Sequence, residues 1–219
     1  MKIDATLLSI LKNFASINQS VIFKPGNIQT TMSPAKTIMA RADIGQEIDR
    51  KFAIYDLSRF LGVLGLFKNP EIELTDNSLI VSSGAHRINY MYASEETIKA
   101  PPDKLIKLPS VDVSLTITAL TLITVQKAMG ALTLPEFSIV GDGQNMYVTA
   151  WDSKNSSTDV YRVDIGQTDK KFAMIFKGEN MRLLPLDYDV QICSKGISYW
   201  HNDSISYWIA VEGNSKFES

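Results

Sequence analysis

Residues 43–54 read Asp-Ile-Gly-Gln-Glu-Ile-Asp-Arg-Lys-Phe-Ala-Ile, and residues 164–174 read Asp-Ile-Gly-Gln-Thr-Asp-Lys-Lys-Phe-Ala-Met. The Asp-Ile-Gly-Gln matches start at 43 and 164, which is 121 residues apart, and the Lys-Phe-Ala matches start at 51 and 171, which is 120 apart. Two matches in the same order at nearly the same offset indicate duplication. Because this offset is too long for a solenoid repeat, it predicts two copies of one domain.

Length and composition fit two compact domains. The chain has 219 residues, of which 45% are hydrophobic and 21% charged, enough for two domains of about 100 residues with real cores. A connector is expected at 94–109, where Pro101, Pro102 and Pro109 remove backbone donors and disfavour helix. We therefore expect one domain over 1–108 and a second over 109–219.

Hydrophobic spacing predicts a helix and then strands in the first half. The apolar residues that recur at helical spacing are Leu7, Leu8, Ile10, Leu11, Phe14 and Ile17, while Ser9, Lys12, Asn13 and Ser16 occupy the other side. Asp56 is placed to cap a second helix, Leu57–Leu66, that turns Leu57, Phe60, Leu61 and Leu64 inward. The predicted strands are Val21–Lys24, Ile28–Thr31, Ile38–Ile44, Lys51–Tyr55, Ile72–Thr75, Leu79–Ser82 and Arg87–Tyr92.

The second half predicts the same order of elements. A helix over about Ala119–Ala131 precedes the strands, and a short helix over about Glu179–Leu184 is expected to end before Pro185. The predicted strands are Phe137–Val140, Met146–Trp151, Asp159–Ile165, Lys171–Phe176, Val190–Cys193, Ile197–Trp200 and Ile205–Val211. Short strands with two helices in each half predict an α+β fold, with antiparallel sheets and both helices of a half on one face.

Charge and residue chemistry narrow the function. The formal net charge is −2, which argues against binding that neutralises many phosphates and leaves room for one basic face. His86 and His201 have no metal-ligand spacing around them, and Cys193 is expected to be a buried strand residue. Gly141-Asp142-Gly143 lacks the Gly-Lys-Ser/Thr of a phosphate loop and is interpreted as a hairpin turn. No catalytic residue, metal or cofactor is predicted.

Cysteine content and hydropathy bear on location. With one cysteine, no intramolecular disulfide can form, which is typical of a reducing cytoplasm. No stretch approaches the roughly 20 apolar residues needed to cross a bilayer, so no membrane association is expected.

The sequence resembles the sliding clamps of T-even-type tailed phages. The resemblance is carried by Leu11-Lys12-Asn13-Phe14-Ala15-Ser16-Ile17-Asn18, by Phe52-Ala53-Ile54-Tyr55-Asp56-Leu57 with Phe60-Leu61-Gly62, and by the connector around Ala100-Pro101. It covers essentially the whole chain in order and is weaker in the second half. The resemblance implies two repeats of the DNA-clamp domain per chain, a homotrimeric ring with sheets outside and helices lining the hole, and no enzymatic activity.

The resemblance also implies where functional residues lie. Basic residues on or beside the four expected helices would line the hole and face DNA: Lys12, Arg59, Lys68, Lys127, Lys177 and Arg182. The last strand of the first domain would meet a strand of the second domain in the next subunit, nominating Ile88, Tyr90 and Tyr92 against Val160, Tyr161 and Val163. An apolar pocket for partner peptides would involve Leu105, Ile106, Trp208 and Phe217. Each of these residues could instead be an ordinary surface or core residue.

The implied partners are double-stranded DNA without sequence preference, a DNA polymerase and an ATP-dependent clamp loader in the cytoplasm of an infected bacterium. A role in late transcription is a further expectation of the family. Thr118, Thr121 and Thr124 lie on the polar side of the helix expected after residue 118, where their hydroxyls could contact phosphate. Two other hypotheses stay open at this point: a duplicated α+β enzyme with a site between its domains, and a structural phage protein.

Overall fold

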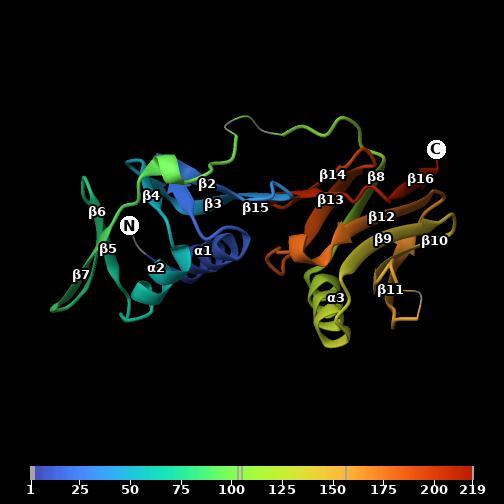
Figure 1. Cartoon of the computed structure of the whole chain (residues 1–219), viewed down its shortest axis with the longest axis horizontal. Helices are drawn as coiled ribbons and strands as arrows, with labels where there is room; N and C mark the ends of the chain where they lie inside the picture. Colours follow the sequence, from blue (N-terminus) through green and yellow to red (C-terminus); the bar gives the residue numbers. More distant parts are fainter. Residues whose placement is uncertain (1–2, 103, 105, 156, 219) are drawn as a thin grey trace. The chain divides into compact units, whose positions relative to one another are not determined.

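The computed structural model describes residues 3–102, 104, 106–155 and 157–218. It divides into two compact units, Met1–Lys104 and Leu105–Ser219 (Figure 1). No helix in the described part of the chain is both long and apolar enough to span a membrane.

The residues of unit 1 that the structure describes form a first helix, seven strands and a second helix. In chain order its elements are α1 Ala5–Ile17, β1 Val21–Phe23, β2 Gly26–Met32, β3 Ile38–Ile48, β4 Phe52–Ile54, α2 Leu57–Leu64, β5 Glu71–Leu74, β6 Ser78–Ser83, β7 His86–Met91 and the 3-10 turn η1 Glu95–Thr97. Strand β1 pairs with β4, β2 with β3, and β5, β6 and β7 form an antiparallel sheet. Helices α1 and α2 pack together on one side of the strands (Figure 1).

The described part of unit 2 has one α-helix and more strands than unit 1. Its elements are β8 Val113–Ile117, α3 Ala119–Leu132, β9 Glu136–Asp142, β10 Asn145–Trp151, β11 Tyr161–Gln167, β12 Lys171–Lys177, the 3-10 turn η2 Gly178–Asn180, β13 Tyr188–Cys193, β14 Ile197–His201, β15 Ile205–Ala210 and β16 Lys216–Glu218. One antiparallel sheet has the order β11-β10-β9-β12-β16. A second set of antiparallel strands runs β15-β14-β13-β8. The helix α3 packs against β10 and β11.

The α+β class with antiparallel sheets is confirmed. The prediction of a fourth helix, over about Glu179–Leu184, is wrong. Only one 3-10 turn forms at Gly178–Asn180, and residues 181–187 carry no helix. Two strands, β8 and β16, were not predicted. On α1, Asn13 is buried with the apolar residues rather than exposed, and on α2 Leu61 is only half-buried. Cys193 is buried in β13, as predicted.

The repeated motif occupies equivalent places in both units. Asp43 pairs with Ile28 and Asp164 with Tyr147, and in each hairpin the register shifts beside that pair. The motif's glycine has a positive φ in both copies, +70° at Gly45 and +149° at Gly166. Because residues with a Cβ rarely adopt these angles, the bulge in each hairpin explains why glycine recurs in the motif.

Candidate DNA-facing and subunit interfaces

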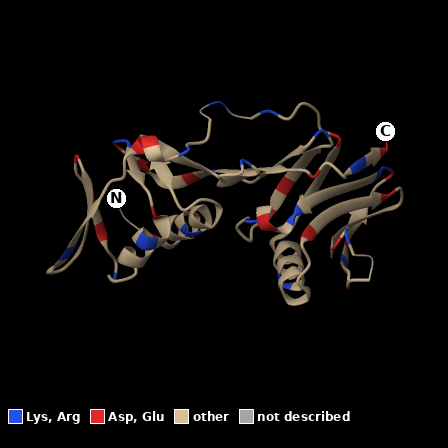
Figure 2. Cartoon of the chain, viewed as in Figure 1, with Lys and Arg blue, Asp and Glu red and all other residues tan. Residues whose placement is uncertain are grey.

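The solvent side of α1 carries one cation among small polar residues. Leu7, Leu11 and Phe14 are buried, which turns the opposite side of the helix to solvent. That side exposes Ser9, Lys12 and Ser16 together with Ala5 and Thr6. Lys12 is therefore accessible, as the helical spacing predicted. In Figure 2 the helices carry little of the blue that marks Lys and Arg.

The solvent side of α2 likewise carries a single cation. Arg59 is exposed, and its backbone N–H donates to Oδ1 of the capping Asp56 at 2.8 Å. Lys68 is exposed but lies beyond the helix, in the turn before β5, where its carbonyl accepts a hydrogen bond from Ser83 Oγ at 3.0 Å.

On α3, the exposed Lys127 is the one basic residue, and the threonines are engaged locally. Thr118 caps the helix by accepting from the N–H of Thr121 at 3.2 Å, and the two hydroxyls lie 3.0 Å apart. Thr124 Oγ1 donates to the carbonyl of Leu120 at 2.8 Å. Because these hydroxyls already have partners within the helix, they are less available to phosphate than the sequence suggested. Leu120 is 73% exposed, so this surface is largely uncharged.

The structure does not place Lys177 and Arg182 on a helix. Lys177 ends strand β12, and its Nζ lies 3.9 Å from a carboxylate oxygen of Glu212. Arg182 is exposed in the segment after η2, between the buried Met181 and Leu183. The expected helix at 179–184 was the reason for choosing both residues, so that reason no longer holds.

The strands nominated for the subunit contact, β7 and β11, each lie at one edge of a sheet, and β5 and β16 lie at the opposite edges of the same two sheets. Strand β7 is the last strand of β5-β6-β7, and β11 is the first of β11-β10-β9-β12-β16. Along β7 the side chains of Ile88 and Tyr90 are half-buried, as is Tyr92 just beyond the strand, and along β11 Tyr161 and Val163 are half-buried. A strand of another chain can pair with such an edge, because its outer backbone N–H and C=O groups are unpaired and its inner side chains are only half-buried.

Two further residues at these edges are exposed apolar groups. Val160, which precedes β11, is 61% exposed, and Met91 at the end of β7 is 60% exposed. Val160 was predicted as an interface residue, and Met91 was not. The alternation that turns Tyr90 inward turns Met91 outward, which was a signal available in the sequence.

The four residues nominated for a peptide pocket do not form one described surface. Leu105 lies outside the described residues. Trp208 is only 6% exposed, and its indole N–H donates to the carbonyl of Ile106 at 3.0 Å. Phe217 lies in β16 opposite Phe172, in the other sheet of unit 2. Beside Trp208, the ring of Tyr199 lies at 4.9 Å and also stacks on His201 at 4.7 Å; sequence reasoning did not select Tyr199.

The described residues hold no cluster of three or more His, Cys, Asp or Glu side chains arranged for a metal ion. His86 lies in β7 and His201 in β14.

The fold is that of the DNA clamps. The proliferating cellular nuclear antigen of Entamoeba histolytica superposes with a TM-score of 0.71 over 95% of both chains at 11% identity. The Helicobacter pylori beta clamp bound to a DNA ligase peptide gives 0.71, covering 97% of this chain and 65% of that one at 13% identity. These likenesses define the class of fold as a clamp built from repeated α+β domains.

Family models assign the chain more closely. The model described as DNA polymerase processivity factor matches residues 2–100, and the model described as gp45 sliding clamp, C terminal, matches residues 99–213. The chain belongs to the gp45 family of sliding clamps, which are non-enzymatic DNA polymerase processivity factors.

Phage relatives agree with this assignment. The sliding clamp of Vibrio phage KVP40 is 29% identical over 97% of this chain and 99% of its own length. The sliding clamp of Enterobacteria phage T4 is 27% identical over 98% of both. The resemblance to T-even-type phage clamps is thereby confirmed.

Proposed function

We propose that three copies of this chain form a homotrimeric ring around double-stranded DNA and hold a DNA polymerase on its template. The observation that carries the proposal is the pair of free edges, β7 in unit 1 and β11 in unit 2. Because the two edges differ, a contact between β7 of one copy and β11 of the next is head-to-tail. Such contacts generate closed rings when the rotation between successive copies brings the last copy back to the first. Three chains of two units each supply six domains.

The proposed ring contact pairs Ile88, Tyr90 and Tyr92 of one copy with Val160, Tyr161 and Val163 of the next. Strand pairing would satisfy the backbone groups at both edges and cover these half-buried side chains. Only two short strands take part, so we expect assembly that depends on chain concentration.

In this proposal the helices face the duplex and contact it weakly. The exposed cations of the three helices are Lys12, Arg59 and Lys127, one on each, with Lys68, Lys177 and Arg182 lying off the helices. Because each chain offers few cations, it neutralises few phosphates. The free energy of DNA binding per chain, and the dependence of the affinity on salt, are therefore expected to be small. A ring that encloses DNA does not need strong contacts to stay bound, and weak contacts let it slide along the duplex.

Further partners belong to this proposal and are supported by the family resemblance alone. An ATP-dependent clamp loader would open the ring, in the cytoplasm of an infected bacterium, and polymerase and loader tails would dock near Ile106 and Trp208. A role in late transcription is tested by transcription from a late promoter with and without the protein. No observation in the structure favours the alternatives of an interdomain enzyme or a phage shell protein.

Loading on circular and linear DNA tests the central proposal. The protein, loaded with its cognate loader and ATP onto a nicked circle, is expected to stay bound and to leave when the circle is cut. Native mass spectrometry is expected to show a trimer whose fraction rises with protein concentration. The DNA products made by the cognate polymerase are expected to become longer when the protein is present. A monomer at all concentrations, or equal retention on circles and open-ended DNA, would contradict the proposal.

A further inference from the structure

Unit 1 has a groove along the inner side of its free edge. The groove has a volume of about 480 Å³ and is bordered by the start of α2 and by residues 88–93 of β7 and its continuation. Its side chains from the α2 side are Tyr55, Asp56, Arg59 and Val63. The groove therefore lies where a strand added to β7 would place its inward side chains.

The floor of the groove is fixed by packing. Tyr90 donates its hydroxyl to the carbonyl of Asp56 at 3.0 Å, and its ring meets the edge of Phe60 with centroids 5.2 Å apart. Tyr92 stacks on Phe52 at 5.2 Å. At the rim, Tyr55 is 66% exposed. A fixed floor with an exposed apolar rim is preorganised for a partner segment.

Arg59 places a cation at this groove. Arg59 and Tyr90 line the same groove. Burial raises the pKa of the Tyr90 phenol, Asp56 raises it further, and Arg59 opposes them. Among the described residues Arg59 makes no ion pair in its own unit, although its side chain is exposed. A partner with a carboxylate at the matching place would complete the groove.

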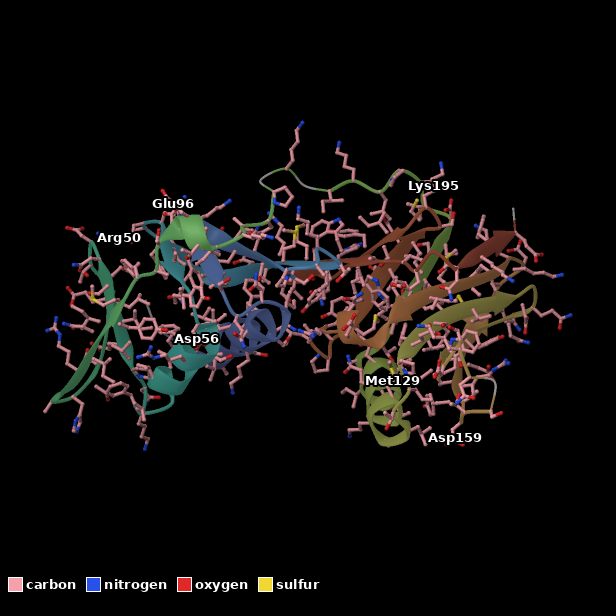
Figure 3. The ribbon with its side chains drawn as sticks, viewed as in Figure 1. Arg50, Asp56, Glu96, Met129, Asp159 and Lys195 are labelled. Atoms are coloured by element: carbon pink, nitrogen blue, oxygen red, sulfur yellow. The ribbon has the colours of Figure 1, made fainter. Side chains whose placement is uncertain are left out.

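The other free edge carries such a carboxylate. Asp159 is exposed in the loop that leads into β11 (Figure 3), and within the described part of unit 2 it makes no ion pair. Asp164, the acidic residue within β11, is already paired with Arg162 at 3.0 Å. Asp159 is thus the acidic group at the β11 edge that remains available.

Strand geometry brings the two charges to the same end and side. In an antiparallel pair the start of β11 lies opposite the end of β7, which is the end that holds Tyr90, Tyr92 and the groove. Side chains alternate along a strand, so Asp159 shares a side with the inward Tyr161 and Val163 if the chain stays extended. The same alternation puts Val160 outward with Met91, the two exposed apolar residues at these edges.

We infer that Arg59 is a subunit-interface residue that pairs with Asp159 of a second copy, while Met91 and Val160 cover each other on the outer side. The inference rests on the proposed ring, with its edge strands paired antiparallel, and deepens it by naming the charge pair that selects the partner edge. It also removes Arg59 from the residues expected to face DNA. Charge pairs at interfaces act mainly on partner selection and orientation.

Charge exchange tests this inference. Arg59→Glu and Asp159→Arg are each expected to weaken trimer formation by about ten-fold, because each leaves two like charges facing one another. Combining the two substitutions in one chain is expected to restore assembly to within about three-fold of the original. Sedimentation velocity over a concentration series measures the assembly, and far-UV circular dichroism checks that each variant is folded.

Lys12→Glu is the matched comparison, because Lys12 is also an exposed helix cation but does not border the groove. It is expected to leave assembly unchanged and to shorten retention on circular DNA. Should Arg59→Glu behave like Lys12→Glu, with normal assembly, Arg59 faces DNA and the inference is wrong while the ring stands. Failure of the double variant to recover assembly would also overturn the inference. An original chain that never forms trimers would instead overturn the proposed function.

Discussion

In unit 1 the segment after the Lys-Phe-Ala motif forms the helix α2, whereas in unit 2 the equivalent segment forms one 3-10 turn and then no helix through residue 187. The helix begins where the Asp56 carboxylate accepts from the N–H of Arg59, and Leu57, Phe60 and Leu64 are buried at helical spacing. In unit 2, Met181 and Leu183 are buried on either side of the exposed Arg182. That alternation belongs to an extended chain.

The segment without a helix needs other partners for its backbone. Leu184 donates its N–H to the hydroxyl of Tyr207 at 3.0 Å and accepts from the hydroxyl of Tyr188 at 2.9 Å. Both tyrosine rings are fully buried. Asp187 Oδ1 in turn accepts from the N–H of Ala119 at 2.7 Å, at the start of α3. In unit 2, side chains therefore make the hydrogen bonds that a helix would have made within its own backbone.

The motif's phenylalanine is also packed differently in the two units. Phe52 is paired with Phe23, and their rings stack at 4.7 Å. Phe172 is paired with Gly141, and a Cβ at that glycine would lie 2.6 Å from the Phe172 ring and 2.7 Å from the carbonyl oxygen of Lys170. The residue opposite the motif's phenylalanine is thus a second aromatic ring in unit 1 and a glycine, which has no side chain, in unit 2.

The largest effect is expected from Gly141→Ala. The added methyl group meets backbone as well as a ring, so the strand has to shift, at a cost of about 3 kcal/mol in the free energy of unfolding. The tryptophans Trp151, Trp200 and Trp208 all lie in unit 2, so urea unfolding followed by tryptophan fluorescence reports on this unit.

Gly130→Ala is the control for that change. A Cβ at Gly130 meets nothing within 4 Å, and the residue lies inside α3, so the variant is expected to keep its stability or gain up to about 1 kcal/mol. If Gly141→Ala has the same free energy of unfolding as the original chain, the strand and the Phe172 ring can move to make room for the methyl group without loss of stability.

The next effect concerns the tyrosines that replace the helix. Tyr207→Phe removes the acceptor for the N–H of Leu184 and is expected to cost about 1–3 kcal/mol, the usual penalty for a buried polar group without a partner. Tryptophan fluorescence in urea again measures the change. Tyr199→Phe, whose half-buried hydroxyl lies 3.2 Å from Ser206 Oγ, should cost about 1 kcal/mol or less. If both variants lose the same amount, the hydroxyl of Tyr207 has no special part in holding the segment.

Sequence reasoning succeeded where the signal is local. Helix α1 was predicted from apolar spacing, and α2 from apolar spacing and the cap at Asp56, whose side chain accepts a backbone N–H. Asp4 and Thr118 cap α1 and α3 in the same way, although neither was predicted as a cap. The helix at 179–184 failed because the equivalence of the two halves was extended to a segment whose own alternation, Met181-Arg182-Leu183, favours an extended chain. The alternating Val113, Leu115 and Ile117 of β8 was a similar local signal that the sequence analysis did not use.

The candidate site was less predictable because exposure depends on distant contacts. The indole of Trp208 is covered by the Ile106 carbonyl, 102 residues away in the sequence, and no local pattern gives that pairing. The position of Arg59 beside Tyr90 likewise depends on how α2 packs against β7. By contrast, the exposure of Lys12 could be predicted, since it follows from the helical period alone.

A smaller effect tests the helix that unit 2 lacks. Asp56→Ala removes the carboxylate that caps α2 and is expected to cost about 1 kcal/mol. Hydrogen exchange is expected to speed up at the N–H of Arg59 and across the first turn of α2. Ser58→Ala, on the exposed side of the same turn, should leave exchange nearly unchanged. Unchanged exchange in Asp56→Ala would mean that packing of Leu57 and Phe60 alone fixes the start of the helix.

The smallest effect concerns β8, a strand with no counterpart in the described part of unit 1. Asp112, just before β8, accepts hydrogen bonds from Ser194 Oγ at 2.6 Å and from the Ser194 N–H at 2.7 Å. The Ser194 hydroxyl, followed by its N–H, lowers the pKa of the Asp112 carboxyl below its ordinary value. Asp112→Asn is therefore expected to cost about 1 kcal/mol or less at neutral pH, because the residue is partly exposed.

The sign of the pH dependence follows from that lowered pKa. A carboxyl whose pKa is lower in the folded chain stabilises it above the unfolded pKa of about 4, and the contribution is lost as pH falls through the folded value. The difference in unfolding free energy between the original chain and Asp112→Asn should thus be constant near pH 7 and shrink below about pH 4. Urea unfolding at several pH values measures it, with the exposed Asp203→Asn as control. A difference that stays constant down to pH 3 would mean that β8 is held at this point by shape and neutral hydrogen bonds, so that the added strand of unit 2 does not depend on the charge of Asp112.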